Sequence, residues 1–471
     1  MTVQLDSNVE KMHSWIDAHT DELVAALQGV LRIPSVEADP AGPEAPYGKH
    51  VRAALDYTLS LCEQMGFRVR DCDGYAGDAE FGSGDEYVGV LGHLDVVPEG
   101  DGWKDPPYSA VIHDGFIYAR GSSDDKGPTY AALWAAKALM ESDVQLKRRV
   151  RLIFGCNEES GFGCVHHYFE VRKEERPAVG FTPDAGFPLY YAEKGICNLL
   201  LEKAISAGDA DLKVVSAKGG LRPNMVPDSA EAVLQGNETG IANALVELNK
   251  YWDKNITWKL EGSSIHIKAL GKSAHGSTPR EGDNAVERLF RCLRSLELPL
   301  DHEWLSQSFY SLETTGTVLG IAHTDDVAGP LTSNLGILDY DGNRVQLTFN
   351  VRYPVTWVID DVKTALSTYL ETSGWSLADV HNQASLYVPL DTEPARTLLR
   401  VYQEETGDTT TKPATTGGGT YARATPHMVA YGAGFPGGSD GPAHQVDERI
   451  AIDTLVRSAK IFAHALYELA K

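Results

Sequence analysis

The sequence predicts an α/β protein: a mostly parallel sheet with helices on both faces, interrupted by an inserted α+β domain. Towards both ends of the chain, short apolar segments alternate with amphipathic helical segments, which is typical of parallel sheets. Between them, longer segments alternate apolar with polar residues, as strands do in a sheet that is exposed on one face. The expected boundaries place residues 1–190 and 390–471 in the first domain and residues 191–389 in the insertion.

The first domain is expected to begin with helices and to continue with strands. Apolar residues recur at helical spacing over residues 9–31 and again over 51–65. The pattern then predicts strands at 87–91, 150–155 and Val179–Thr182, a hairpin within 110–119 and a helix at 129–140. After Pro389 it predicts a helix at 394–406, a glycine-rich loop TTGGGTYAR, a strand at 428–431 and a final helix up to Lys471.

The insertion is expected to form a sheet that is exposed on one face. SSIHIKAL (residues 263–270) and RVQLTFNVRY (Arg344–Tyr353) alternate apolar with polar side chains. Each is followed by a helical pattern, over residues 284–296 and 360–373 respectively. The similar order of elements predicts two related halves, although no repeat of residues is visible.

Composition predicts a cytoplasmic globular protein. The formal net charge of -24 and the pI near 5.0 argue against a nucleic-acid partner, which needs a basic surface, and they suit a divalent metal. No signal peptide and no run of 18 apolar residues is visible, so no membrane contact is expected. The six cysteines form no C-x-x-C motif, so free thiols in a reducing compartment are expected.

Potential metal ligands follow the expected strands and the hairpin of the first domain. These are His93 after VGVLG, Asp124 or Asp125 in ARGSSDDKG, Glu158 and Glu159 after RLIFGCN, and Asp184 after VGFTP. Because sites in α/β sheets assemble at the carboxyl ends of the strands, we expect these side chains to meet. Oxygen and imidazole ligands without thiolate suit zinc, cobalt or manganese. Several carboxylates suit two ions, with one aspartate shared between them.

These segments resemble a known family, the dinuclear zinc peptidases that include aminoacylases, carnosinases and carboxypeptidase G. The motifs occur in the order GHLDVVP, ARGSSDDKGP, CNEESG, TPDAGFP and GGSDGPAHQVDE. The sequence is similar in particular to a monomeric bacterial dipeptidase of that family, through NMVPD, SAHGSTP, NVRYP and GGGTYAR. The resemblance implies a catalytic domain interrupted by a lid domain.

The resemblance also implies five metal ligands. His93 and Asp184 would bind one zinc ion, Glu159 and His444 would bind the other, and Asp124 would bridge the two. Asp124 is favoured over its neighbour because the ligand in the family's motif stands two residues before the lysine, here Lys126.

Two acidic residues next to the ligands are expected to act in catalysis. Glu158 would be the general base that takes a proton from the attacking water and returns it to the leaving amine. Asp95 would accept a hydrogen bond from the far nitrogen of His93, which fixes the tautomer that offers a lone pair to zinc.

Substrate-binding residues are implied in the insertion and in the glycine loop: Asn224, Arg352, Gly418, Gly419 and Thr420. By itself His275 is typical of a surface histidine, but the resemblance implies that it stabilises the oxyanion. The planar guanidinium of Arg352 suits a peptide carboxylate. The glycine run fits either a flexible turn or a set of main-chain N–H groups around that carboxylate.

The sequence therefore predicts a zinc-dependent dipeptidase with two zinc ions, which cleaves dipeptides that have a free C-terminal carboxylate. A deacylase of N-acyl amino acids is the alternative, because the shared metal core does not select the acyl group. A metal-binding or peptide-binding protein without activity is disfavoured, since a binder needs no base beside its ligands. A monomer is expected, because the insertion is long enough for two lid halves.

Overall fold

The computed structural model describes residues 5–205, 210–296 and 314–471, and the chain divides into two compact units. The first comprises Met1–Ala192, Leu386–Thr415 and Gly419–Lys471, and the second comprises Glu193–Ser385 and Thr416–Gly418. The chain therefore passes between the units at 192/193 and 385/386, and again at 415/416 and 418/419. The expectation of two crossings missed the second pair, because a three-residue excursion leaves no change in sequence pattern.

The sheet of the first unit has parallel strands at its centre. Its order is β1-β2-β6-β3-β7-β22-β9-β20, with β21 paired to β9. The pairs β6–β3, β3–β7 and β7–β22 are parallel, whereas β1–β2, β2–β6 and β22–β9 are antiparallel. The bounds are β1 Arg68–Cys72, β2 Ala76–Phe81, β3 Tyr87–His93, β6 Arg149–Gly155, β7 Val179–Thr182, β9 Tyr190–Glu193, β20 Leu386–Tyr387, β21 Ala414–Thr416 and β22 Met428–Ala430. The predicted α/β fold with a mostly parallel core is confirmed.

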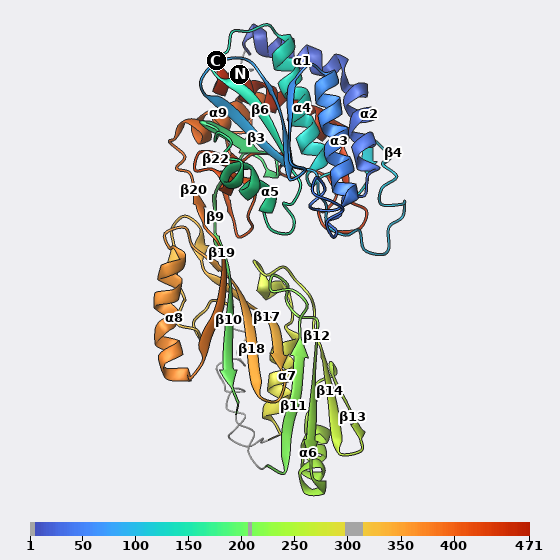
Figure 1. Ribbon diagram of the computed structural model, residues 1–471, viewed down its shortest axis with the longest axis vertical. Helices are drawn as coiled ribbons and strands as arrows, with labels where there is room; N and C mark the ends of the chain where they lie inside the picture. The colour runs from blue at the N-terminus through green and yellow to red at the C-terminus, as the bar shows by residue number, and fades with distance from the viewer. Residues whose placement is uncertain (1–4, 206–209, 297–313) are drawn as a thin grey trace. The chain divides into compact units, whose positions relative to one another are not determined.

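Helices cover both faces of this sheet. On one face lie the long helices α1 Ser7–Ala18, α2 Thr20–Leu31, α3 Lys49–Gln64, α4 Lys126–Glu141, α9 Glu393–Thr406 and α10 Ile452–Ala470. The other face carries the short α5 Gly163–His166, a π-helix His167–Val171 and a 3-10 helix Tyr421–Ala424, and α5 is visible there in Figure 1. Close approach on both faces explains two strand glycines. A Cβ on Gly92 would lie 2.0 Å from the Thr129 hydroxyl of α4, and one on Gly155 would lie 2.2 Å from the Tyr421 hydroxyl.

The helical pattern at residues 9–31 forms two helices rather than one. They meet at His19, whose backbone has φ -114° and ψ 19°. The His19 ring stacks on Trp15, and its Nδ1 lies 2.7 Å from the Trp15 main-chain oxygen. The same carbonyl accepts the main-chain N–H of His19 at 3.1 Å, so His19 contacts Trp15 through both its main chain and its ring where α1 ends. Apolar spacing does not report this break, because both helices bury the same side.

Two small sheets bring later segments beside the strand ends. The predicted hairpin is β4 Val111–His113 and β5 Phe116–Tyr118, and β24 Arg449–Ala451 adds to it as an antiparallel strand. β8 Ala185–Gly186 pairs in parallel with β23 Ala433–Gly434. Residues separated by more than 200 positions in the sequence are thereby placed side by side.

The second unit is built on one antiparallel sheet of order β13-β14-β12-β11-β17-β18-β10-β19. The strands are β10 Gly195–Ala204, β11 Leu212–Gly219, β12 Ser229–Gly236, β13 Ile256–Glu261, β14 Ser264–Leu270, β17 Thr332–Tyr340, β18 Arg344–Tyr353 and β19 Ser376–Gln383. Its helices are α6 Glu238–Lys250, α7 Ala285–Arg294 and α8 Ile359–Ser373. In Figure 1, α6 and α7 lie beside β11–β14, whereas α8 lies beside β10 and β19. Two four-stranded groups meet where β11 pairs with β17.

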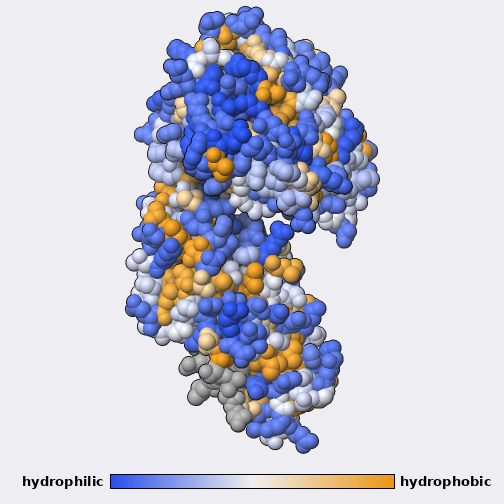
Figure 2. Space-filling view, in the orientation of Figure 1, coloured by the Kyte–Doolittle hydropathy of each residue, from blue (hydrophilic) through white to orange (hydrophobic). Residues whose placement is uncertain are grey.

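The cysteines lie in the interior of the protein. All six are buried and none forms a disulfide. Within the described ranges, no helix is long and apolar enough to cross a membrane. On the face seen in Figure 2, hydrophilic side chains dominate the first unit, and apolar ones are more frequent on the second. The second unit includes Leu221 and Trp252, which are 91% and 89% exposed.

Candidate active site

Three adjacent parallel strands end at the same edge of the sheet and deliver acidic and imidazole side chains there. His93 is the last residue of β3, Glu158 and Glu159 follow β6, and Asp184 follows β7. Parallel strands place their carboxyl ends side by side, so these side chains meet although the sequence separates them.

The side chains form two overlapping groups whose candidate ligand atoms lie within 4.8 Å of one another. One group is His93, Glu158 and Asp184, and the other is His93, Asp124 and Glu159. Nε2 of His93 lies 3.0 Å from Oδ1 of Asp124 and 4.0 Å from Oδ2 of Asp184. Glu158 therefore lies among the candidate ligands.

His444 joins the same cluster from the segment before β24. Its Nε2 lies 3.0 Å from Oδ2 of Asp124 and 3.1 Å from Oε2 of Glu159. Asp124 thus faces His93 with one carboxylate oxygen and His444 with the other. An aspartate with this arrangement suits a bridge between two cations.

The neighbouring Asp125 has a different environment. Its Oδ2 accepts hydrogen bonds from the main-chain N–H of His93 at 3.2 Å and from the Thr129 hydroxyl at 2.9 Å. Burial raises the pKa of Asp125 to about 7. Of the two adjacent aspartates, Asp124 is the one that contacts both histidines.

Asp95 has other partners than the sequence analysis expected. The Nδ1 of His93 lies 2.9 Å from the main-chain oxygen of Asp95, whereas the Asp95 carboxylate is 3.6 Å away. A carbonyl oxygen only accepts, so it still fixes Nδ1 as the protonated nitrogen and leaves Nε2 for a metal. The Asp95 carboxylate instead accepts the main-chain N–H groups of Glu158 at 3.0 Å and Glu159 at 3.1 Å. It therefore holds the acidic loop as well as lying beside the imidazole.

Glu37 supports this loop from the other side and was missed in the sequence. Its Oε2 accepts a hydrogen bond from Nδ2 of Asn157 at 3.1 Å and another from the Ser160 hydroxyl. Glu37 lies 120 positions before Asn157 and belongs to no motif, so no sequence signal could have found it.

The electrostatics of the cluster suit divalent cations. Burial raises the pKa values of Glu158, Glu159 and Asp184 above their usual range. Burial acts in the same direction on Asp124, but hydrogen bonds from His444 and His93 hold its pKa below the usual range. Bonds to Asp124 and Glu159 raise the pKa of His444 to about 11. Buried carboxylates that exceed the available imidazoles need positive charge, and oxygen and imidazole donors without thiolate fit zinc, cobalt or manganese.

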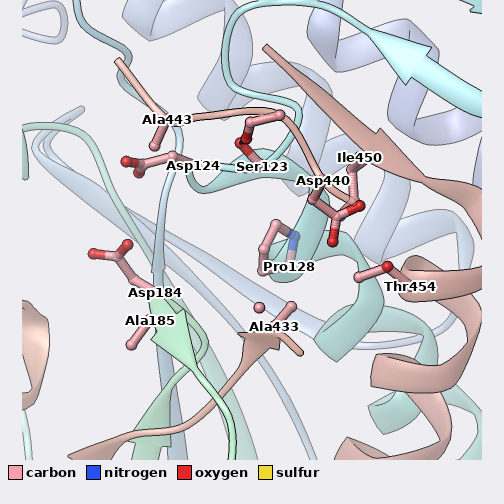
Figure 3. A pocket seen from close by; sticks show the side chains of 12 residues that line it. Ser123, Asp124, Pro128, Asp184, Ala185, Ala433, Asp440, Ala443, Ile450 and Thr454 are labelled. Atoms are coloured by element: carbon pink, nitrogen blue, oxygen red, sulfur yellow. Dashed lines mark hydrogen bonds between the residues drawn. The ribbon is translucent and has the colours of Figure 1, made fainter. Parts of the chain in front are cut away.

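A pocket of about 300 Å³ lies beside the cluster within the first unit. Asp124 and Asp184 line it together with small or apolar residues that include Pro128, Ala433 and Ile450. Figure 3 shows the carboxylates of Asp124 and Asp184 on one side of this space. The cluster therefore borders a space large enough for a small molecule.

The second unit contains two predicted substrate-binding residues, Asn224 and Arg352, and the predicted oxyanion residue His275. Gly276 N–H donates to the main-chain oxygen of Asn224 at 2.7 Å, and the adjacent His275 is exposed, with Nδ1 2.6 Å from the Ser277 hydroxyl. A Cβ on Gly276 would lie 2.9 Å from Oδ1 of Asn350, which accepts Nε of Arg352 at 2.9 Å. Arg352 is 4% exposed, and its guanidinium is oriented by the contact with Asn350.

The glycine run lies beside that guanidinium, but it differs from an open set of N–H groups. Nη1 of Arg352 donates to the main-chain oxygen of Gly417 at 3.0 Å. Gly418 N–H donates to the Thr416 hydroxyl at 2.9 Å. The Thr420 hydroxyl accepts the N–H of Ala422 and caps the 3-10 helix. Gly419 packs against Arg423, whose Nε would lie 2.6 Å from a Cβ there.

Comparison with known proteins identifies the family. The family model described as peptidase family M20/M25/M40 matches residues 89–468, which include all the candidate ligands and substrate-binding residues. The chain belongs to peptidase family M20/M25/M40. It is a metallopeptidase, and the family predicted from the motifs is confirmed.

Relatives of this M20 chain extend over almost its whole length. "Putative dipeptidase YtjP" of Bacillus subtilis is 41% identical over 463 residues, which cover 96% of this chain and 98% of that one. "Putative dipeptidase SSP1012" of Staphylococcus saprophyticus is 36% identical, with 96% and 98% covered.

Solved structures share the fold at lower identity. Human carnosine dipeptidase 1 is 19% identical with a TM-score of 0.54, and 98% of this chain and 99% of that chain are covered. The dipeptidase Dug1p of Saccharomyces cerevisiae is 16% identical with a TM-score of 0.57, and 98% of each chain is covered.

Alanine variants of the adjacent Glu158 and Glu159 should lose activity for different reasons. If Glu159 is a metal ligand, as the sequence predicts, Glu159→Ala should reduce the number of bound ions that metal analysis finds relative to the unaltered chain. Replacing Glu158→Ala should leave the metal content unchanged and reduce turnover by at least about 100-fold, the usual scale of general acid–base catalysis. Loss of metal from the Glu158 variant, with a full metal content in the Glu159 variant, would show that Glu158 is the ligand and Glu159 the base.

Proposed function

We propose that this M20 peptidase is a zinc-dependent dipeptidase that hydrolyses dipeptides with a free C-terminal carboxylate. The observation that carries the proposal is the likeness, over nearly the whole chain, to relatives that are named dipeptidases, at 41% and 36% identity. The acidic cluster and the pocket beside it are consistent with hydrolysis of a small substrate.

In this proposal the ligand cluster would hold two ions. His93 and Asp184 would bind one, Glu159 and His444 would bind the other, and Asp124 would contact both. The ions would supply Lewis acidity to the scissile carbonyl and to a water molecule. Cobalt or manganese could substitute for zinc, because the donors are oxygen and imidazole.

Glu158 is proposed to transfer the protons of the reaction. Burial, together with the charges of Glu159 and Asp124, raises its pKa well above the usual range, although His93 acts in the opposite direction. A carboxylate with a raised pKa takes a proton from water more readily and can return it to the leaving amine. The hydrogen bond from the Glu158 main-chain N–H to the Asp95 carboxylate fixes the backbone position of Glu158 beside the cluster.

Arg352 is proposed to bind the substrate carboxylate, and His275 to stabilise the oxyanion, with Asn224 and the glycine run assisting. Hydrogen bonds to Asn350 and Gly417 orient the guanidinium of Arg352 in advance of binding. A pre-oriented planar fork loses little entropy when it pairs with a carboxylate. Deacylation of N-acyl amino acids remains the second candidate, because those substrates have the same carboxylate beside the scissile amide.

Substrate length tests the carboxylate contact. Dipeptides should be cleaved and tripeptides hardly at all, because an added C-terminal residue moves the charge away from Arg352 and leaves buried donors unpaired. Replacing Arg352→Lys should lower kcat/KM for dipeptides by about 10- to 100-fold, since a buried charged hydrogen bond contributes roughly 1.5–3 kcal/mol.

Arg344→Lys is the matched control, because Arg344 lies at the exposed end of the same strand. Equal rates on dipeptides, tripeptides and dipeptide amides would contradict the carboxylate contact. Preference for acetyl or succinyl amino acids over all dipeptides would favour the deacylase.

Subunit mixing tests whether the enzyme acts as a monomer. Trp252 and Leu221 are large apolar side chains exposed in the second unit, an exposure that is also normal on monomers. We expect a mass near 51 kDa in sedimentation, and no activity when an inactive Glu158→Ala chain is mixed with an inactive His275→Ala chain. Recovered activity in the mixture would show that His275 acts on a neighbouring chain.

A further inference from the structure

We propose that Glu448 is a positioning residue that sets Asp124 and His444 in place for metal binding. This inference rests on the proposed metal centre and adds a residue that contacts neither substrate nor metal. Glu448 stands four positions after His444, and its side chain reaches the loop that carries Asp124.

The carboxylate of Glu448 is fully buried, and the partners of its two oxygens all come from residues 120–124. Oε2 accepts Nη1 of Arg120 at 2.7 Å and the N–H of Gly121 at 3.1 Å. Oε1 accepts the N–H of Ser123 at 2.9 Å, its hydroxyl at 3.0 Å and the N–H of Asp124 at 3.2 Å. One side chain thus fixes the main chain at Asp124 itself and at two other positions in its loop.

Arg120 extends this contact to two further segments. Its Nη1 also donates to the main-chain oxygen of Gln445 at 3.2 Å, directly after His444. Its Nη2 donates to the main-chain oxygens of Pro98 at 3.3 Å and Glu99 at 3.2 Å, in the loop that follows His93. The buried Arg120–Glu448 pair therefore connects the three segments that carry His93, Asp124 and His444.

The segment of His444 needs such support because its backbone is strained. His444 has φ 63° and Asp447 has φ 59°, and residues other than glycine keep this conformation only where surrounding contacts impose it. Contacts at both ends of the segment impose it here. Gly441 N–H donates to the Arg449 oxygen at 2.8 Å, and the main-chain oxygen of Glu448 accepts the Ala119 N–H at 3.1 Å. Figure 3 shows Ser123 and Asp124 beside Ala443, the residue before His444.

The geometry separates this role from that of a purely structural ion pair. If Glu448 only balanced the charge of Arg120, any carboxylate near Arg120 would suffice. If it positions ligands, the length of the side chain matters, because both oxygens must reach their partners in residues 120–124 at once. Glu448→Asp keeps the charge but is too short for both oxygens to reach their donors. Glu448→Gln keeps the length but replaces one accepting oxygen with an NH2 group, which cannot accept a hydrogen bond.

The experiment is a calorimetric titration of metal-stripped full-length protein with zinc ions. We expect Glu448→Gln and Glu448→Asp both to bind zinc about 10- to 100-fold more weakly than the unaltered chain, the usual effect of losing a partner behind the ligands. Asp453→Asn is the matched control. It removes an exposed carboxylate that pairs with Arg457 on α10, and it should bind zinc like the unaltered chain.

Circular dichroism of the metal-free variants separates misfolding from lost positioning. A folded Glu448→Gln or Glu448→Asp chain with unaltered zinc affinity would overturn the proposal. If both variants fail to fold, Ser123→Ala tests the proposal instead, because it removes only one hydrogen-bonding hydroxyl from the Glu448 carboxylate. This variant should bind zinc measurably more weakly than the unaltered chain. An unchanged zinc affinity would overturn the proposal. An unaltered chain that binds fewer than two zinc ions would instead contradict the proposed metal centre itself.

Discussion

The contact of Asp124 with both histidines is the interaction on which the rest of the site depends. One carboxylate oxygen faces His93 and the other faces His444, each at 3.0 Å. This places candidate ligands for two cations on either side of a single carboxylate, whose side chain is 17% exposed. Like-charged ions can occupy neighbouring positions only when an anion lies between them, so the orientation of this one side chain limits what the cluster can bind.

The surrounding carboxylates act mainly on the main chain. Asp95 accepts the N–H groups of the two glutamates, Asp125 accepts that of His93, and Glu448 accepts that of Asp124. Each buried carboxylate is thereby hydrogen-bonded, which offsets part of the cost of removing it from water. Each also fixes a loop that carries a ligand. A site on loops becomes rigid when acidic side chains accept the main-chain N–H groups that would be bonded within a helix or a sheet.

The two units supply different chemistry. The first unit holds the acidic cluster at the ends of its parallel strands. The second holds Arg352 on a strand of its antiparallel sheet, and Asn224 and His275 in segments between strands. Arg352 is buried and oriented by Asn350, whereas His275 and Asn224 are exposed. This division suits a peptidase whose metal centre and whose recognition of the carboxylate are proposed to lie in separate parts of the chain.

The sequence by itself determined the α/β class, the strand ends and the family, because each leaves a local signal. Strands such as β7 and β18 have the predicted bounds, since periodicity and flanking turns lie within a few residues of each other. Motif order was enough to nominate His93, Asp124, Glu159, Asp184 and His444, which the structure brings together. Only the tertiary structure decided that Asp95 holds the glutamate loop, that Glu37 and Glu448 support ligand segments, and that residues 416–418 belong to the second unit. Those features depend on contacts between residues far apart in the chain, and such contacts impose no spacing that a single sequence can display.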